Sequence, residues 1–232
     1  MKKPINSMIY ITTKTFNNIK EKTNQIVQIP EQNIDYLPFS NKKRVYFDKD
    51  EDSFYLWKKD KTDKWKINIK FQKIEFDQEL IEYMDIIIDQ ALLETKKIFQ
   101  SENNDISFKE KEIGALKSAV FSIVNKFDYY NEQVDIFDFV TEILIRILTG
   151  HYLIDGNKRT ALMVLILTLK QFVYYFYWSS KNDIFFIQHY EEHIENDLVS
   201  FTHKLQDKFK TEEITLKIKD WIYDRTMINF DN

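Results

Sequence analysis

The chain has 232 residues, a length that fits one domain with an extension or two small domains. Its 44% apolar and 30% charged residues predict a globular core and exclude a disordered chain. The net charge of −4 argues against a nucleic-acid binder, the absence of cysteine excludes disulfides and thiolate sites, and only 3 glycines argue against a Gly-rich nucleotide loop.

The first 75 residues are predicted to form a small β-rich extension. All three prolines lie within the first 38 residues. Short strands are expected over 45–47, 53–57 and 64–71, separated by charged turns. Lysines and asparagine alternate with apolar residues over 66–71, as is typical of a half-buried strand. We expect an antiparallel meander here, and the sequence assigns it no role.

From about residue 76 the apolar spacing becomes helical, which predicts a helical domain over residues 76–226. The first helix carries an apolar stripe from Leu80 to Leu92, and a second spans about 109–126 with Ile113 facing inward. Asp135 is expected to cap a third helix, which Gly150 ends. Further helices are expected over about 157–178, 184–209 and 212–223. The predicted fold class is therefore mainly α, with a small N-terminal α+β extension.

No membrane segment or leader peptide is expected. The apolar tract 161–178 is long enough to suggest a span, but Lys170 and Gln171 interrupt it, so we predict a buried helix. Pro4, Asn6 and Ser7 interrupt the apolar residues at the N-terminus. These features predict a cytoplasmic protein with no membrane partner.

The polar segment 150–161 lies between two strongly apolar helices and is the candidate site. Gly156 allows consecutive backbone N–H groups to approach a phosphate. Asn157 begins the next helix, whose N-terminus favours anions. Lys158 and Arg159 add positive charge at an end that normally disfavours cations, which makes sense if an anion neutralises them.

Two further residues of this segment suit phosphate chemistry. Asp155 offers an oxygen ligand for Mg²⁺, with phosphates and waters supplying the other ligands. His151, four residues earlier, is a side chain whose ordinary pKa suits a proton acceptor near neutral pH. The sequence therefore predicts an anion site with a base beside it.

The segment from His151 to Asn157 resembles the motif of the Fic/Doc (Fido) family, His-x-Phe-x-(Asp/Glu)-(Gly/Ala)-Asn. The continuation Lys158-Arg159 is similar to the Doc (death-on-curing) branch, whereas Fic-type members continue Gly-Arg-x-x-Arg. Leu153 stands where the family has Phe, and we expect Leu to fill much of that volume. The resemblance extends over about 76–223 and implies a helical fold.

The resemblance also implies an activity, the transfer of a nucleotide-derived phosphate group to a protein hydroxyl. His151 would be the general base, Asp155 would hold Mg²⁺, and Gly156, Asn157, Lys158 and Arg159 would bind the phosphates of ATP. Lys158 in place of glycine implies transfer of the γ-phosphate to a Ser or Thr of a target protein, with translation machinery as the target class. The expected protein is a toxin of a toxin–antitoxin system.

Three alternatives remain at the level of the sequence. One is AMP transfer on the same fold, which the absence of the second Fic arginine, at Leu162, weakens. Another is a catalytically silent domain that serves as a binding module. The family's inhibitory helix pattern is not found in this sequence, so any restraint would come from a separate antitoxin chain or from nothing. The third is a zinc site at His189 and His193, which fit His-x-x-Glu-His but more often form a solvated helix face.

Overall fold

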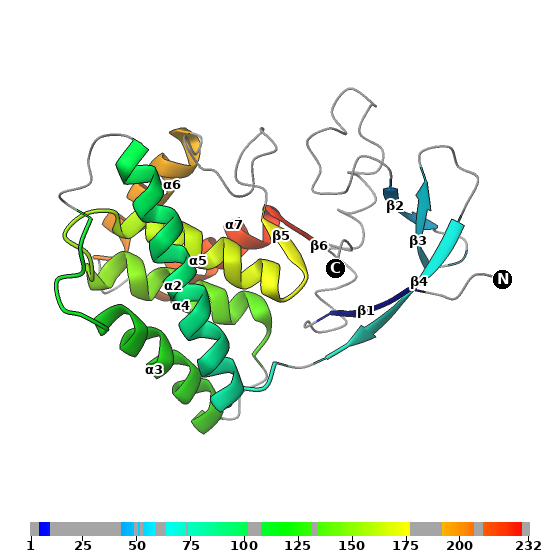
Figure 1. The fold of residues 1–232 in the computed structure, drawn as a ribbon, viewed down its shortest axis with the longest axis horizontal. Helices are drawn as coiled ribbons and strands as arrows, with labels where there is room; N and C mark the ends of the chain where they lie inside the picture. The colour runs from blue at the N-terminus through cyan, green and yellow to red at the C-terminus, as the bar shows by residue number, and fades with distance from the viewer. Residues whose placement is uncertain are drawn as a thin grey trace.

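The computed structural model describes residues 5–9, 43–48, 51, 53–58, 64–72, 74–101, 108–130, 134–176, 192–206 and 211–228. Within these ranges the first strands form one sheet, and a bundle of helices follows it along the chain (Figure 1). The expectation of a mainly helical protein with a small β-rich N-terminal part is confirmed.

The sheet contains β1 (Ile5–Ile9), β2 (Lys43–Asp48), β3 (Ser53–Lys58) and β4 (Lys64–Phe71), in the order β1-β4-β3-β2. The pairs β2–β3 and β3–β4 are antiparallel, which confirms the predicted meander. In β4, Lys66 and Lys70 are exposed and Ile67 is buried, as the alternation predicts. The parallel strand β1 was not predicted, because a partner so distant in sequence leaves no hairpin pattern.

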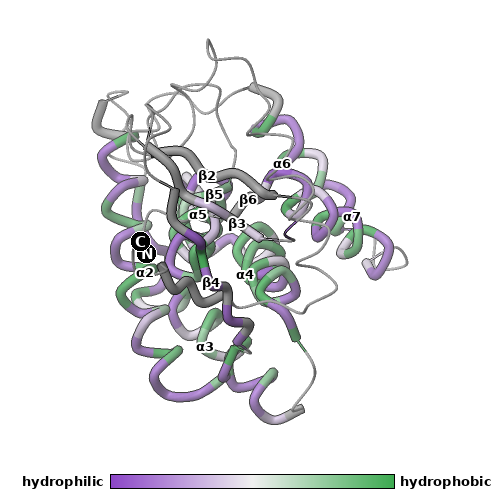
Figure 2. Tube along the Cα trace, turned by 90° about the vertical axis from the view of Figure 1, so that its right-hand side faces the viewer, coloured by the Kyte–Doolittle hydropathy of each residue, from purple (hydrophilic) through white to green (hydrophobic). Residues whose placement is uncertain are grey.

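The described helices are α2 (Gln78–Ser101), α3 (Ala115–Tyr130), α4 (Ile136–Gly150), α5 (Asn157–Gln171), α6 (Glu192–Lys204) and α7 (Thr211–Asp224). Helix α5 packs between α4 and α2, and α7 covers another side of α4. Helix α4 is rich in hydrophobic residues (Figure 2), and nine of its fifteen residues are buried. The apolar stripe expected on α2 is confirmed, since Leu80, Met84, Ile88 and Ala91 are buried.

The expected start of the second helix was wrong. Helix α3 begins at Ala115, and Ile113 is 92% exposed instead of facing inward. The residues before α3 hydrogen-bond to the segment that follows α4, so their backbone groups are already used outside a helix. Gly114, with φ +81°, then makes the turn into α3.

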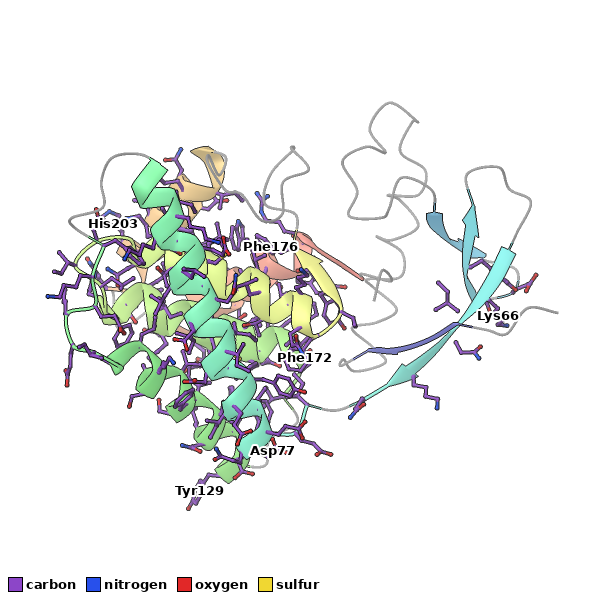
Figure 3. The ribbon with its side chains drawn as sticks, viewed as in Figure 1. Lys66, Asp77, Tyr129, Phe172, Phe176 and His203 are labelled. Carbon is purple, nitrogen blue, oxygen red and sulfur yellow. The ribbon has the colours of Figure 1, made fainter. Side chains whose placement is uncertain are left out.

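The expected extension of the fourth helix to residue 178 was also wrong. Helix α5 ends at Gln171, and β5 (Tyr174–Phe176) pairs antiparallel with β6 (Thr226–Ile228). Aromatic residues favour strands, and this short run finds a strand partner after α7. Phe172 and Phe176 are buried where the chain leaves α5 (Figure 3), which confirms core packing for the start of the aromatic tract; residues 177 and 178 lie outside the described part of the chain.

No helix in the described part of the chain is long and apolar enough to cross a membrane. The apolar tract instead supplies α5, whose residues from Thr160 to Ile166 are all buried in the protein.

Helix α4 is held at its start by the capping box that the sequence predicts in part. The Asp135 carboxylate accepts the N–H groups of Phe137 and Asp138 at 2.9 and 3.0 Å, and Asp138 accepts the Asp135 N–H at 3.2 Å. Lys219 of α7 lies 2.5 Å from Asp138 and 3.6 Å from Asp135. Burial, followed by the neighbouring Asp138 charge, raises the pKa of Asp135 even though Lys219 opposes the shift.

We expect Asp135→Ala to lower the free energy of unfolding by about 1 kcal/mol, within the range of roughly 0.5–2 kcal/mol for a lost cap. Asp135→Asn should cost much less, because Asn caps as well as Asp and carries no charge to bury. Urea unfolding of the two variants and the wild type measures both effects. Equal losses in the two variants would show that the ion pair with Lys219, and not the cap, carries the stabilisation.

Candidate active site

The connection between α4 and α5, together with the first turn of α5, contains every residue predicted for the site. Helix α4 ends at Gly150, as expected, but the left-handed residue that follows the helix is His151, with φ 49° and ψ 45°. Histidine adopts this conformation several-fold more often than most non-glycine residues. The His151 side chain is exposed, so its ring is open to a substrate from solvent.

Gly150 is needed for space and not for a left-handed backbone. A Cβ atom on Gly150 would lie 2.2 Å from the Tyr152 ring, well inside van der Waals contact. The ring of Tyr152, half-buried against the core, therefore folds back over the last residue of α4. This contact directs the chain as it leaves the helix.

A short two-stranded pairing fixes the next part of the loop. The Lys111 N–H donates to the Tyr152 carbonyl at 2.8 Å, and the Ile154 N–H donates to the Lys109 carbonyl at 2.9 Å. Between them, Glu110 and Leu153 form an antiparallel bridge. The apolar spacing predicted a helix from about residue 109, so this pairing was not expected. Its only sign in the sequence is Gly114, a residue that interrupts the expected helix near its start.

Leu153 anchors the loop in the core. Its side chain is 1% exposed, so leucine occupies the interior position where the family motif has phenylalanine. The Asn157 side chain then clamps the Leu153 backbone from α5. Its Oδ1 accepts the Leu153 N–H at 2.9 Å, and its Nδ2 donates to the Leu153 carbonyl at 2.8 Å. The Asn157 amide is thus engaged by the loop, and its backbone N–H belongs to the first turn of α5.

The start of α5 has the features of an anion-binding helix end. Gly156 is the N-cap residue, with φ 87° and ψ 7°, and it offers no side-chain cap to the first-turn N–H groups. The first turn contains no acidic residue but contains Lys158 and Arg159, both half-buried. Positive side chains are unfavourable beside the positive N-terminal end of the helix dipole. A bound anion would neutralise the side chains and the helix end together.

The Asp155 carboxylate fits the expected magnesium ligand. It is exposed beside the start of α5, and its Oδ1 accepts the Gly156 N–H at 2.6 Å. Magnesium sites at phosphates commonly use one or two carboxylates and take their other ligands from phosphates and water. No group of three or more His, Asp or Glu side chains that could hold a metal occurs among the described residues. The histidines of the alternative zinc motif, His189 and the side chain of His193, lie outside that part of the chain.

We expect Asn157→Ala to free the buried backbone of Leu153 and to cost about 1–3 kcal/mol of stability, the penalty of leaving buried polar groups unpaired. The Leu153 amide proton should exchange with solvent faster in this variant, as measured by hydrogen exchange. Asn157→Asp retains the acceptor and should keep that proton protected. Unchanged exchange at Leu153 in Asn157→Ala would contradict the clamp.

Comparison with known proteins agrees with this geometry. The model of the Fic/DOC family matches residues 75–169, which run from the end of the sheet through α5. No curated protein and no solved structure matches the chain significantly. The matched segment contains the helix before the motif, the loop with His151 and the start of α5, and the match supports assigning this part of the chain to the Fic/Doc family.

Proposed function

We propose that this protein is a Doc-like enzyme that transfers the γ-phosphate of ATP to a Ser or Thr hydroxyl of a target protein. The observation that carries the proposal is the placement of an exposed histidine and a cationic helix N-terminus at the two ends of one short, anchored loop. His151 lies at the end of α4, and Lys158 and Arg159 lie in the first turn of α5. A base and an anion site at this spacing suit phosphoryl transfer, in which positioning and charge stabilisation do most of the work.

In the proposed reaction, His151 accepts the proton of the target hydroxyl as its oxygen forms a bond to the γ-phosphorus. The bond between the γ-phosphorus and the β–γ bridging oxygen breaks, and ADP leaves with the electron pair. Lys158, Arg159 and the N–H groups of α5 stabilise the negative charge on the phosphates. Asp155 would hold Mg²⁺, which would neutralise further phosphate charge when bound.

Two residues favour the γ-phosphate over AMP as the transferred group. Lys158 brings a cation to the position where Fic-type members have glycine. Leu162 stands where those members have their second arginine, and it is 1% exposed in the core. The side of α5 that would present a second arginine to a nucleotide is thus packed against other helices. This difference in the placement of charge supports a nucleotide bound in the Doc orientation.

The biological setting follows from the same proposal. A Doc-like enzyme would act as a cytoplasmic toxin on a protein substrate, with translation machinery as the target class. Its inhibitor would be a separate antitoxin chain, because the family's inhibitory helix pattern is absent from the sequence.

The proposal is tested by labelling a lysate of the host with ATP carrying the label on either the γ- or the α-phosphate, in the presence of Mg²⁺. We expect transfer of the γ-label only. His151→Asn should reduce the rate by roughly 10²–10⁴-fold, the contribution of a general base. Asparagine tolerates the left-handed conformation, so this variant removes the proton acceptor and keeps the backbone of the loop.

Tyr129→Ala, a change of an exposed side chain at the end of α3 (Figure 3), is the control and should keep full activity. Transfer of the α-label would establish AMP transfer in place of the kinase reaction. Transfer of neither label, with the wild type folded and ATP bound, would favour the silent binding module.

A further inference from the structure

Helix α2 carries an apolar stripe that the fold leaves uncovered. Tyr83, Ile86 and Leu93 are 43%, 66% and 49% exposed, and they lie on the side of α2 opposite its buried stripe. Two views agree on the position of this helix. It crosses the front of the bundle in Figure 1 and forms one edge of the bundle in Figure 2. Large apolar side chains gathered on one outer face are typical of an interaction surface.

The spacing of the stripe is that of a coiled coil. Together with three polar residues, the exposed side chains follow one another at intervals of 4, 3, 4, 3 and 4 residues, the alternation of a and d positions. All six residues are exposed, and the three apolar ones are at least 43% exposed. We call this set the α2 seam; its members are Glu79, Tyr83, Ile86, Gln90, Leu93 and Lys97.

The charges of α2 indicate which partner fits the seam. The exposed acidic residues Glu79 and Glu82 lie in its first turns, and the exposed basic residues Lys96 and Lys97 lie toward its end. A second copy of the helix, laid antiparallel with position 88 facing position 88, would place Glu79 opposite Lys97. The same register places Tyr83 opposite Leu93 and Ile86 opposite Gln90. The charged ends and the Tyr83–Leu93 contacts are therefore self-complementary, as a two-fold symmetric interface requires, and Ile86 meets the Gln90 amide between them.

The centre of this pairing contains one like-charge contact, which a lysine of the same subunit partly offsets. Asp89 would lie near its own copy across the two-fold axis. Lys117 of α3 lies 2.8 Å from Asp89 and 2.8 Å from Asp85, so these carboxylates share a cation within the subunit. Glu94 is partly shielded as well, because its carboxylate accepts hydrogen bonds from Gln90 and Lys97 of the same helix.

We propose that two copies of this chain associate through an antiparallel pairing of their α2 seams. A single helix pair is a small interface compared with the roughly 1,200–2,000 Å² of stable complexes, so dissociation in about the micromolar range is expected. The inference is independent of the catalytic proposal, because none of the seam residues belongs to the loop between α4 and α5.

Sedimentation velocity over roughly 1–200 µM protein provides the first test. We expect a concentration-dependent dimer, and Ile86→Glu should weaken it by about a hundredfold, because it replaces an apolar side chain of the interface with a buried charge. Leu216→Glu, at a 60% exposed leucine on α7, is the matched control and should leave the dimer unchanged. A monomer throughout this range, or equal effects of the two variants, would overturn the proposal.

A mixing experiment tests the antiparallel register and does not depend on the stability of one variant. The first variant combines Glu79→Lys with Glu82→Lys, and the second combines Lys96→Glu with Lys97→Glu. Each alone places like charges together and should dimerise about tenfold more weakly than the wild type. Mixed in equal amounts, the two variants should form a heterodimer at protein concentrations no higher than those at which the wild type dimerises. Failure to recover association on mixing would contradict the pairing.

Discussion

The clamp between Asn157 and the Leu153 backbone is the constraint on which the site depends. Leu153 is buried, so its N–H and carbonyl groups must be satisfied within the protein, and one side chain from α5 satisfies both. The pairing of Lys109 and Lys111 with the neighbouring loop residues holds the opposite edge. Between these two supports, the chain has little freedom to move His151 relative to the start of α5. A flexible loop would lose conformational entropy each time a nucleotide bound, and this loss would weaken binding.

Two left-handed residues bracket the loop, and each has a different physical reason. Gly156 adopts φ 87° where a side chain would be strained, and it begins α5 without a cap that would compete with an anion. His151 adopts φ 49° although it has a Cβ atom, and the surrounding contacts must maintain that conformation. The backbone strain therefore lies at His151, the residue whose side chain is proposed to accept the proton. Strain of this kind is often found where the position of a side chain matters for chemistry.

The sequence predicted much of the fold and the location of the site, and the failures share a cause. The meander, the stripe of α2, the cap at Asp135 and the end of α4 follow local patterns and were correct. Ile113, β5 and β1 were mispredicted because contacts between distant segments decided them. The local sequence around 109–113 fits a helix, but the loop after α4 uses those backbone groups instead. The Asn157 clamp was likewise not predicted, because the motif indicates the type of loop but not which backbone atoms the Asn157 amide contacts.

Helix α2 links the outer surface of the protein to the scaffold of the site. One face of α2 packs on α5, the helix whose first turn carries Lys158 and Arg159, and the α2 seam lies on the other side. A partner that binds the seam only when α2 is folded stabilises α2 by mass action, and with it the contact that holds α5 in place. The apolar side chains left exposed on α2 are unfavourable in an isolated subunit, so covering them would strengthen the support of the site without touching the loop itself.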